Sequence, residues 1–340
     1  MNTKVLLLSL LAITGTALFF LNQAADTKND PIRQMKTAQF ANFRTEFNKE
    51  YSSVEELEYR FTVFMDTLKL IENHNNKADS DYTLGINQFS DLTFEEFTAK
   101  YLGVPDYVQT DEPVIDDPSL LFGILDNVDW VAAGKVSLVR NQGSCGSCWS
   151  FATNAALESA YAIFKNIKGI LLSEQELIDC STSYGNNGCN GGWMPNAYNY
   201  IKAKKINLES KYPYKAINQS CNTALSGKGP YGITGYTALS AGVSYTVNAI
   251  AQQPVAIAFH VQSDFQSYKS GVYNPASCPG SVNHGVTAVG YRLKDSVPNL
   301  FVKNSWGNTW GNNGYFNIAI GTGSGTCSLA ATTGNSYPSV

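Results

Sequence analysis

Seven cysteines constrain the fold of this chain more than any other feature of its sequence. All of them lie beyond residue 144: Cys145, Cys148, Cys180, Cys189, Cys221, Cys278 and Cys327. In an exported chain, cysteines at this density pair into disulfides that fix loops around a core. Because seven is odd, one thiol is left over, and it is either a structural cysteine or a reactive one.

The N-terminal residues indicate export. An apolar run at residues 5–21 follows Lys4, and the small residues Ala24 and Ala25 come soon after it. This order is typical of a secretory signal peptide, which we place at residues 1–25. The alternative is a membrane anchor, but 17 residues interrupted by serine, threonine and glycine are at the short end for crossing a bilayer.

Charge is divided unevenly along the 340 residues, whose net charge is −4. Residues 26–122 hold 9 lysines and arginines against 19 aspartates and glutamates, a balance of −10. Residues 123–340 hold 14 against 9, a balance of +5. The chain therefore lacks the overall basic charge of a nucleic-acid-binding protein, and its two segments are expected to attract each other.

The acidic segment begins as a helical module. Apolar residues recur at helical spacing through residues 30–75, at Phe40, Phe43, Phe47, Leu57, Phe61, Phe64, Leu68 and Ile71. Glu56 and Arg60 are four residues apart, where they can pair on one face of a helix. From Tyr101 to Asp126, prolines and acidic residues predict a linker that proteases reach easily.

The basic segment combines helices and strands. A helix is predicted from Cys148 to about Phe164, and a second one, with a capping box, from Ser173. Farther along, alternating apolar residues predict strands at 255–261 and 316–320. Helices first and strands later favour an α+β fold in two halves with a cleft between them.

Residues 141–151, NQGSCGSCWSF, form the most informative motif. Cys148 lies where this loop becomes a helix, and the free N–H groups and partial positive charge of a helix N-terminus favour a nucleophilic thiolate. The spacing Cys145-x-x-Cys148 also fits a redox pair or half of a zinc site. Three histidines and no second C-x-x-C argue against zinc, and the strand-rich C-terminal half argues against a redox fold.

A thiol nucleophile needs a base that titrates near neutral pH, which means histidine. His74 lies in the acidic module, and His260 lies in the expected strand at 255–261, where a surface or packed histidine is the simpler interpretation. His284 lies at the start of an apolar strand next to Gly285, from which it can reach into a cleft. We therefore predict that His284 is the base for Cys148.

Four motifs resemble the papain family of cysteine proteases, and cathepsin L within it. They are the string around Cys148 with Gln142 near its start, Val282-Asn283-His284-Gly285, Asn304-Ser305-Trp306-Gly307 and Gly188-Cys189-Asn190-Gly191-Gly192. The family's pro-segment pattern falls on Glu56, Arg60, Phe64, Ile71 and Asn73, and then on Gly85, Asn87, Phe89 and Asp91. Thr67 departs from that pattern, which has asparagine there. The resemblance runs from about residue 35 to the C-terminus.

The resemblance implies a papain-like two-lobed fold for a peptidase domain at residues 123–340, with a helical lobe and a β-barrel-like lobe. It also implies a mainly helical pro-domain at residues 26–122 that inhibits the enzyme from within the same chain. The protein would be a monomeric zymogen of the secretory pathway, destined for the lysosome or secreted. It would act on proteins and peptides, with no nucleic-acid partner and no stable membrane anchor.

The resemblance also assigns roles. Cys148 would attack the peptide carbonyl while His284 holds the proton, and Asn304 would orient the imidazole beneath Trp306. Gln142 and the Cys148 N–H would bind the oxyanion. No metal or organic cofactor is required. A catalytically idle relative would be expected to lack one of Gln142, Cys148, His284 or Asn304, and all four are present.

For the substrate, Gly191 and Gly192 would pair with an extended peptide. The main selectivity pocket would be formed by Trp193, Met194, Ala258 and Val282, with Thr332 or Thr333 near its base. These residues carry no charge, so a bulky hydrophobic P2 residue, Phe or Leu, is expected in an endopeptidase.

With Cys148 free, six cysteines allow 15 pairings. The resemblance implies Cys145–Cys189, Cys180–Cys221 and Cys278–Cys327. Asn218-Gln219-Ser220 is the one N-x-Ser/Thr sequon, which makes Asn218 a candidate glycosylation site.

Overall fold

The computed structural model describes residues 31–105, 116–332 and 334–340, and side chains from residue 34 onward. The expected signal peptide and the middle of the expected linker lie outside these residues. The chain forms two compact units, one ending at Leu68 and one from Lys69 to Val340. Among the described residues, no helix has both the length and the apolar composition needed to cross a membrane.

The first unit is helical, as expected. Helix α2 (Pro31–Glu46) and helix α3 (Val54–Asn75), whose last turns belong to the second unit, replace the single helical stretch predicted for residues 30–75. The chain turns between them, where Asn48 has a φ of 51°. The aromatic residues predicted from their spacing form a buried core around Phe40, Phe43 and Phe64. Glu56 and Arg60 pair at 3.9 Å.

The helices of the second unit are α4 (Phe94–Tyr101), α5 (Cys148–Phe164), α6 (Glu174–Cys180), α7 (Met194–Lys204) and α8 (Val243–Ile250). Helix α5 has the bounds that the sequence predicts. Helix α6 begins after Ser173, whose Oγ accepts a hydrogen bond from the Glu176 N–H at 2.9 Å. The second half of the expected capping box does not form, because the Glu176 carboxylate instead accepts from Asn207 at 2.8 Å.

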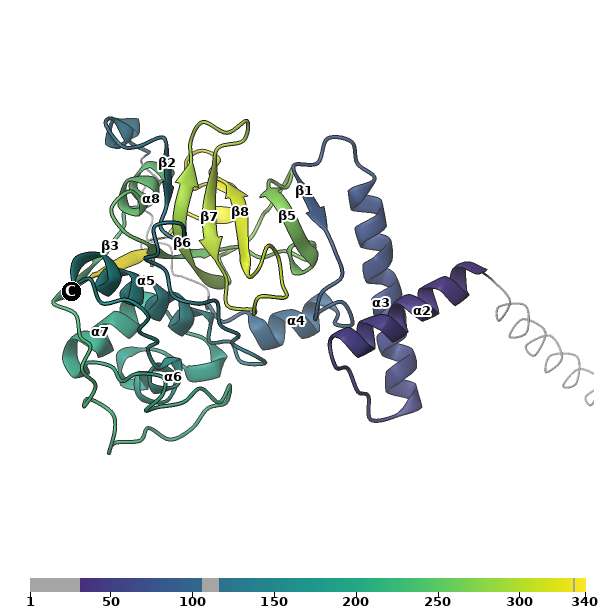
Figure 1. Ribbon diagram of the computed structural model, residues 1–340, viewed down its shortest axis with the longest axis horizontal. Coiled ribbons are helices and arrows are strands. Elements are labelled where there is room, and N and C mark those ends of the chain that lie inside the picture. The colour runs from purple at the N-terminus through teal and green to yellow at the C-terminus, as the bar shows by residue number, and fades with distance from the viewer. Residues whose placement is uncertain (1–30, 106–115, 333) are drawn as a thin grey trace, which may run out of the picture. The chain divides into compact units, whose positions relative to one another are not determined.

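Nine strands form one sheet in the order β1-β5-β8-β7-β6-β4-β9-β3, and β2 also pairs with β6 (Figure 1). The strands are β1 (Tyr82–Leu84), β2 (Asn127–Asp129), β3 (Gly235–Ala238), β4 (Val255–Phe259), β5 (Tyr268–Tyr273), β6 (His284–Arg292), β7 (Asn299–Lys303), β8 (Tyr315–Ala319) and β9 (Ser336–Ser339). Neighbours are antiparallel except β5 and β8. Among the described residues β1 and β3 do not pair, so the expected barrel-like lobe is an open sheet rather than a closed barrel.

Strand β4 shows how the sheet connects two cores. All five of its residues are buried, the larger Val255, Ile257 and Phe259 as well as the two alanines between them. These larger residues pack into the core of the sheet, whereas Ala256 and Ala258 belong to the core around α5. A face lined by alanine allows the helix to approach closely. The start of α5 is thereby placed against β4 and β6, which positions the site described next.

Candidate active site

Three element boundaries bring the expected catalytic side chains together. Cys148 is the first residue of α5, His284 is the first residue of β6, and Asn304 directly follows β7. The backbone N–H of Gly285 lies 3.3 Å from the Cys148 Sγ. A Cβ at residue 285 would lie 3.3 Å from the Trp149 backbone, so glycine permits this close approach of helix and strand.

The imidazole of His284 is held in one orientation. Its Nε2 lies 2.8 Å from the Asn304 Oδ1, and because that oxygen can only accept, Nε2 carries the proton. The Trp306 ring stacks on the imidazole with centroids 4.5 Å apart. His284 Nδ1 is buried without a hydrogen-bond partner among the described residues, which leaves it available for the thiol proton.

The covered site holds an uncharged pair. Burial lowers the pKa of His284 to about 4, against a smaller opposing effect of the Asn304 hydrogen bond. Burial also raises the pKa of Cys148 to about 11, against hydrogen bonds from backbone N–H groups that include those of Gly285 and Gly103. The thiolate predicted from the helix N-terminus is therefore not the form favoured here, because desolvation outweighs the helix N-terminus while the site is covered.

Gln142 presents its side-chain amide to the same region. Its Oε1 accepts a hydrogen bond from the Ser305 Oγ at 2.6 Å, which fixes the amide orientation. Its Nε2 donates to the Cys145 carbonyl at 2.8 Å and to the Tyr101 carbonyl at 2.9 Å. The Tyr101 carbonyl, which belongs to the segment that precedes residue 123, thus occupies the Gln142 amide that the sequence analysis assigns to the oxyanion.

The backbone of Gly103 and Val104 in this segment hydrogen-bonds on two sides, once with Gly192 and once with Asn283. The Gly192 N–H donates to the Gly103 carbonyl at 2.9 Å, and the Val104 N–H donates to the Asn283 carbonyl at 3.1 Å. Gly191 has a φ of 114°, and a Cβ there would lie 2.8 Å from the Gly103 oxygen. Of the two glycines predicted to bind an extended peptide, Gly192 is therefore hydrogen-bonded to Gly103 of this chain, and Gly191 leaves room for it.

The residues of the predicted selectivity pocket lie in and against one larger hydrophobic cluster. Met194, Ala258 and Val282 are buried in it together with Val104, and the partly buried Trp193 packs against it. A Cβ at Gly334 would lie 2.2 Å from the Trp193 ring, so the indole occupies the space that a side chain at residue 334 would need. Gly334 was not anticipated from the sequence. Thr332 instead accepts the Gly334 N–H at 2.9 Å, and Thr333 lies outside the described residues.

Trp306 is covered in turn by the N-terminal segment. The rings of Phe97 and Phe89 meet it edge-on at centroid distances of 5.1 and 5.7 Å. The Gln88 Nε2 donates to the Trp306 carbonyl at 2.6 Å. The sequence identified Phe89 as part of a motif but gave no indication of this partner.

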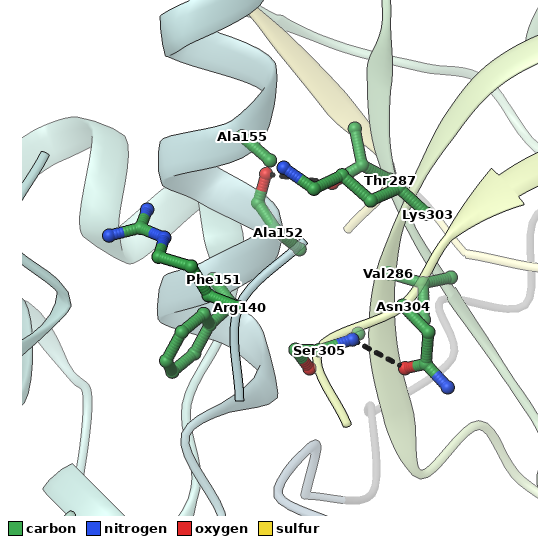
Figure 2. Close-up of a pocket in the computed structure, with 10 residues that line it drawn as sticks. Arg140, Phe151, Ala152, Ala155, Val286, Thr287, Lys303, Asn304 and Ser305 are labelled. Atoms are coloured by element: carbon green, nitrogen blue, oxygen red, sulfur yellow. Dashed lines mark hydrogen bonds between the residues drawn. The ribbon is translucent and has the colours of Figure 1, made fainter. Parts of the chain in front are cut away.

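A buried charged cluster lies beside the site, around a small cavity between α5 and the strands β6 and β7 (Figure 2). Lys303, next to Asn304, donates to the Ser137 Oγ at 2.9 Å. Arg140 pairs with Glu158 at 2.9 Å and with Glu174. Burial lowers the pKa of Lys303 to about 8. The sequence analysis missed this cluster because its members are far apart along the chain.

The cysteines pair as Cys145–Cys189, Cys180–Cys221 and Cys278–Cys327, the pairing that the resemblance implies. The described residues include all seven cysteines, and Cys148 alone is unpaired. The absence of a Cys145–Cys148 bridge argues against the redox alternative. Asn218 is exposed, and its Oδ1 accepts the Cys189 N–H at 2.7 Å. No cluster of metal-ligating side chains occurs among the described residues.

Comparison with known proteins identifies two domains in the chain. Residues 124–337 match the papain family cysteine protease domain, and residues 40–97 match the cathepsin propeptide inhibitor domain. Cysteine proteinase 3 of Solanum lycopersicum is 42% identical over 309 residues, covering 88% of this chain and 84% of the relative. The cathepsin L-like proteinase of Fasciola hepatica is 40% identical over 300 residues, covering 84% and 89%.

Solved precursor structures are similar over nearly the same span. Recombinant stem bromelain precursor matches with a TM-score of 0.80 and 37% identity, covering 90% of this chain and 99% of that structure. Digestive procathepsin L 3 of the Tenebrio molitor larval midgut matches with a TM-score of 0.78 and 34% identity, again covering 90% and 99%. This chain therefore belongs to the papain family of cysteine proteases, as a cathepsin L-like zymogen with an inhibitory propeptide.

Proposed function

We propose that the mature enzyme, residues 123–340, is an endopeptidase in which Cys148 is the nucleophile and His284 the general acid and base. The observation that carries this proposal is the bond from His284 Nε2 to Asn304 beside the unpaired Cys148. Asn304 fixes the ring so that Nδ1 is left for proton transfer. Gln142 and the Cys148 N–H stabilise the oxyanion, and removal of one such donor typically costs about 10²–10³ in rate.

The reaction has two halves. The Cys148 thiol passes its proton to His284 as the Sγ forms a bond to the peptide carbonyl carbon, and the C–N bond breaks as His284 gives that proton to the leaving amine. Water then attacks the thioester while His284 accepts a proton from it, the C–S bond breaks, and the acid product leaves. The thiol and the imidazole return to their starting forms, so no cofactor is consumed.

In the precursor the propeptide is proposed to inhibit through the backbone atoms that it places next to the catalytic residues. The backbone N–H of Gly103, rather than a carbonyl carbon, faces the Cys148 sulfur. The Tyr101 carbonyl meanwhile accepts from the Gln142 amide. The Cys148 sulfur and the Gln142 amide are thus both occupied by backbone groups of the propeptide, but no peptide carbonyl carbon is presented to the thiol for attack.

Opening of the zymogen is proposed to depend on acid. The propeptide, residues 26–122, has a balance of −10 and the mature enzyme a balance of +5, so their attraction weakens as carboxylates become protonated. Cleavage in the linker then separates residues 26–122 from the mature chain. We place the signal peptide at residues 1–25. The mature enzyme is proposed to be a monomer in the lysosome or outside the cell, and to be glycosylated at Asn218. The test is the affinity of the isolated propeptide for the mature enzyme. An affinity that is equal at pH 7 and pH 4.5, and equal in low and high salt, would exclude the electrostatic attraction as the cause of acid opening.

The substrate is proposed to carry a bulky hydrophobic residue at P2. Trp193, Met194, Ala258 and Val282 carry no charge, and the apolar Val104 of the propeptide belongs to the same hydrophobic cluster. Phe or Leu at P2 should give the highest kcat/KM. A substrate panel with best turnover for Arg at P2 would contradict this pocket.

The proposal is tested by incubating the purified precursor at pH 4.5 and assaying cleavage of peptides with Phe or Leu at P2. The wild type should become active, and Cys148→Ala, processed in trans, should stay inactive. A processed wild type without peptidase activity would contradict the proposal. A redox protein would instead show a Cys145–Cys148 disulfide in peptide mapping.

A further inference from the structure

The hydroxyl of Tyr214 lies behind the proposed oxyanion hole. It donates to the backbone carbonyl of Gln142 at 2.6 Å. It also lies 2.7 Å from the Oγ of Ser147. Because the one phenol proton goes to the Gln142 carbonyl, the Ser147 hydroxyl donates in this second bond, which is much shorter than its other contact, with the Cys145 carbonyl at 3.4 Å. Tyr214 thereby connects the residue with the oxyanion-binding amide to the residue before Cys148.

Ser147 is the N-cap of α5, and its side chain has an unusual use. A serine at this position commonly accepts a hydrogen bond from an N–H of the first turn. Among the described residues the Ser147 side chain makes no such capping bond. Its hydroxyl is directed to Tyr214 instead, so the backbone at the start of α5 is held from outside the helix.

Tyr214 is itself firmly placed, although it lies on a loop. Its N–H donates to the Glu209 Oε1 at 3.3 Å, and its ring packs edge-on against Phe151 with centroids 5.0 Å apart. The next residue, Lys215, donates its N–H to the Gln175 Oε1 at 2.8 Å. Burial raises the pKa of the Tyr214 phenol, so it stays protonated as a donor at the pH values where the enzyme works.

We propose that Tyr214 is a positioning residue for peptide hydrolysis, which fixes the Gln142 amide and the Cys148 backbone N–H at the separation that the oxyanion requires. The inference rests on the proposed function. A displacement of about 1 Å can cost about 10²-fold in rate. Loss of the phenol alone leaves the ring packing in place, so a partial loss of about 10-fold is expected.

The test compares Tyr214→Phe with Tyr161→Phe in the full-length precursor after acid processing. Tyr161, in α5, is a matched control because its hydroxyl likewise makes two hydrogen bonds, in its case both with the backbone of Gly232: one to the carbonyl at 2.7 Å and one from the N–H at 3.0 Å. Three quantities are measured: the steady-state constants, the affinity for a peptide aldehyde, and the rate of alkylation by iodoacetamide at pH 5. The aldehyde adduct is a tetrahedral thiohemiacetal whose oxygen takes the place of the oxyanion, whereas alkylation forms no such oxygen.

Tyr214→Phe should lower kcat by about 10-fold with little change in KM, and weaken aldehyde binding by a similar factor. Alkylation should slow much less than kcat, because it needs the thiol and His284 but no bound oxyanion. Tyr161→Phe should change none of the three. In a Gln142→Ala background the effect of Tyr214→Phe should shrink, since both act on the same oxyanion.

Two results, each with an active wild type, would overturn this inference and leave the proposed function standing. In the first, Tyr214→Phe has the same steady-state constants as the wild type. In the second, alkylation of Tyr214→Phe slows as much as kcat, which would indicate general distortion of the site. A processed wild type without peptidase activity would overturn the proposed function and this inference with it.

Discussion

A single substitution at Gly103 should release the inhibition of the precursor. A Cβ there would lie 1.8 Å from the Gly146 carbonyl oxygen and 2.3 Å from its carbon, which are backbone atoms that cannot move aside cheaply. Gly103→Ala should therefore lift the propeptide out of the groove. The change leaves every residue of the mature enzyme intact.

The expected magnitude follows from the contacts that would be lost. The two hydrogen bonds of the Gly103–Val104 peptide with Gly192 and Asn283 contribute about 0.5–1.5 kcal/mol each. Burial of the Val104 side chain contributes about 1.5–3 kcal/mol. Together these amount to roughly 2.5–6 kcal/mol, so the open fraction of the precursor should rise by on the order of 100-fold or more.

The assay is the peptidase activity of the intact precursor near neutral pH, measured before any processing is visible on a gel. Gly103→Ala should show a leak activity about 100-fold or more above that of the wild type. Gly235→Ala, in β3, is the control, because a Cβ at Gly235 meets no atom within 4 Å. A Gly103→Ala precursor as silent as the wild type would refute the account of how the groove is blocked.

Three further predictions concern pocket size, pH and buried charge. Trp193→Ala should open space above Gly334 and raise the kcat/KM ratio of Phe over Leu at P2 by about 10-fold; an unchanged ratio in a substrate panel would place the pocket wall elsewhere. Burial lowers the pKa of His284 in the precursor to about 4, so the unfolded chain binds more protons than the folded one between pH 6.5 and 4. Precursor stability should therefore fall by up to about 3 kcal/mol as pH drops through that window, and urea unfolding of His284→Asn should show a smaller pH dependence. Arg140→Met should lower the free energy of unfolding by about 3–5 kcal/mol, because it leaves two buried glutamates without their partner; a loss below about 1 kcal/mol would mean that this ion pair contributes little.

The sequence predicted those parts of the site that lie at the ends of regular elements. The apolar helix after Cys148 and the apolar strand after His284 are local patterns, so the first residue of each could be located without coordinates. The family motifs then placed Asn304 and Gln142 beside them. The α+β class and the helical N-terminal module followed from periodicity in the same way.

The rest depends on contacts between distant positions, which no local pattern encodes. The meeting of Trp193 with Gly334, and of Tyr214 with Gln142, exists only once the chain is folded. The burial of both faces of β4 is another such case, because the helix that covers its alanine face comes from about 100 residues earlier. The pKa of Cys148 also eluded prediction, since it depends on burial beneath a segment whose place in the groove was not known.

Alkylation of Cys148 tests the central claim most directly. Precursor and processed enzyme are exposed to iodoacetamide at pH 5, and modified peptides are mapped by mass spectrometry alongside the residual peptidase activity. Cys148 should be protected in the precursor and react rapidly after processing, and the enzyme should lose activity in proportion to the modification of Cys148. Cys148 that stays unreactive after processing, or activity that survives its complete alkylation, would contradict the account.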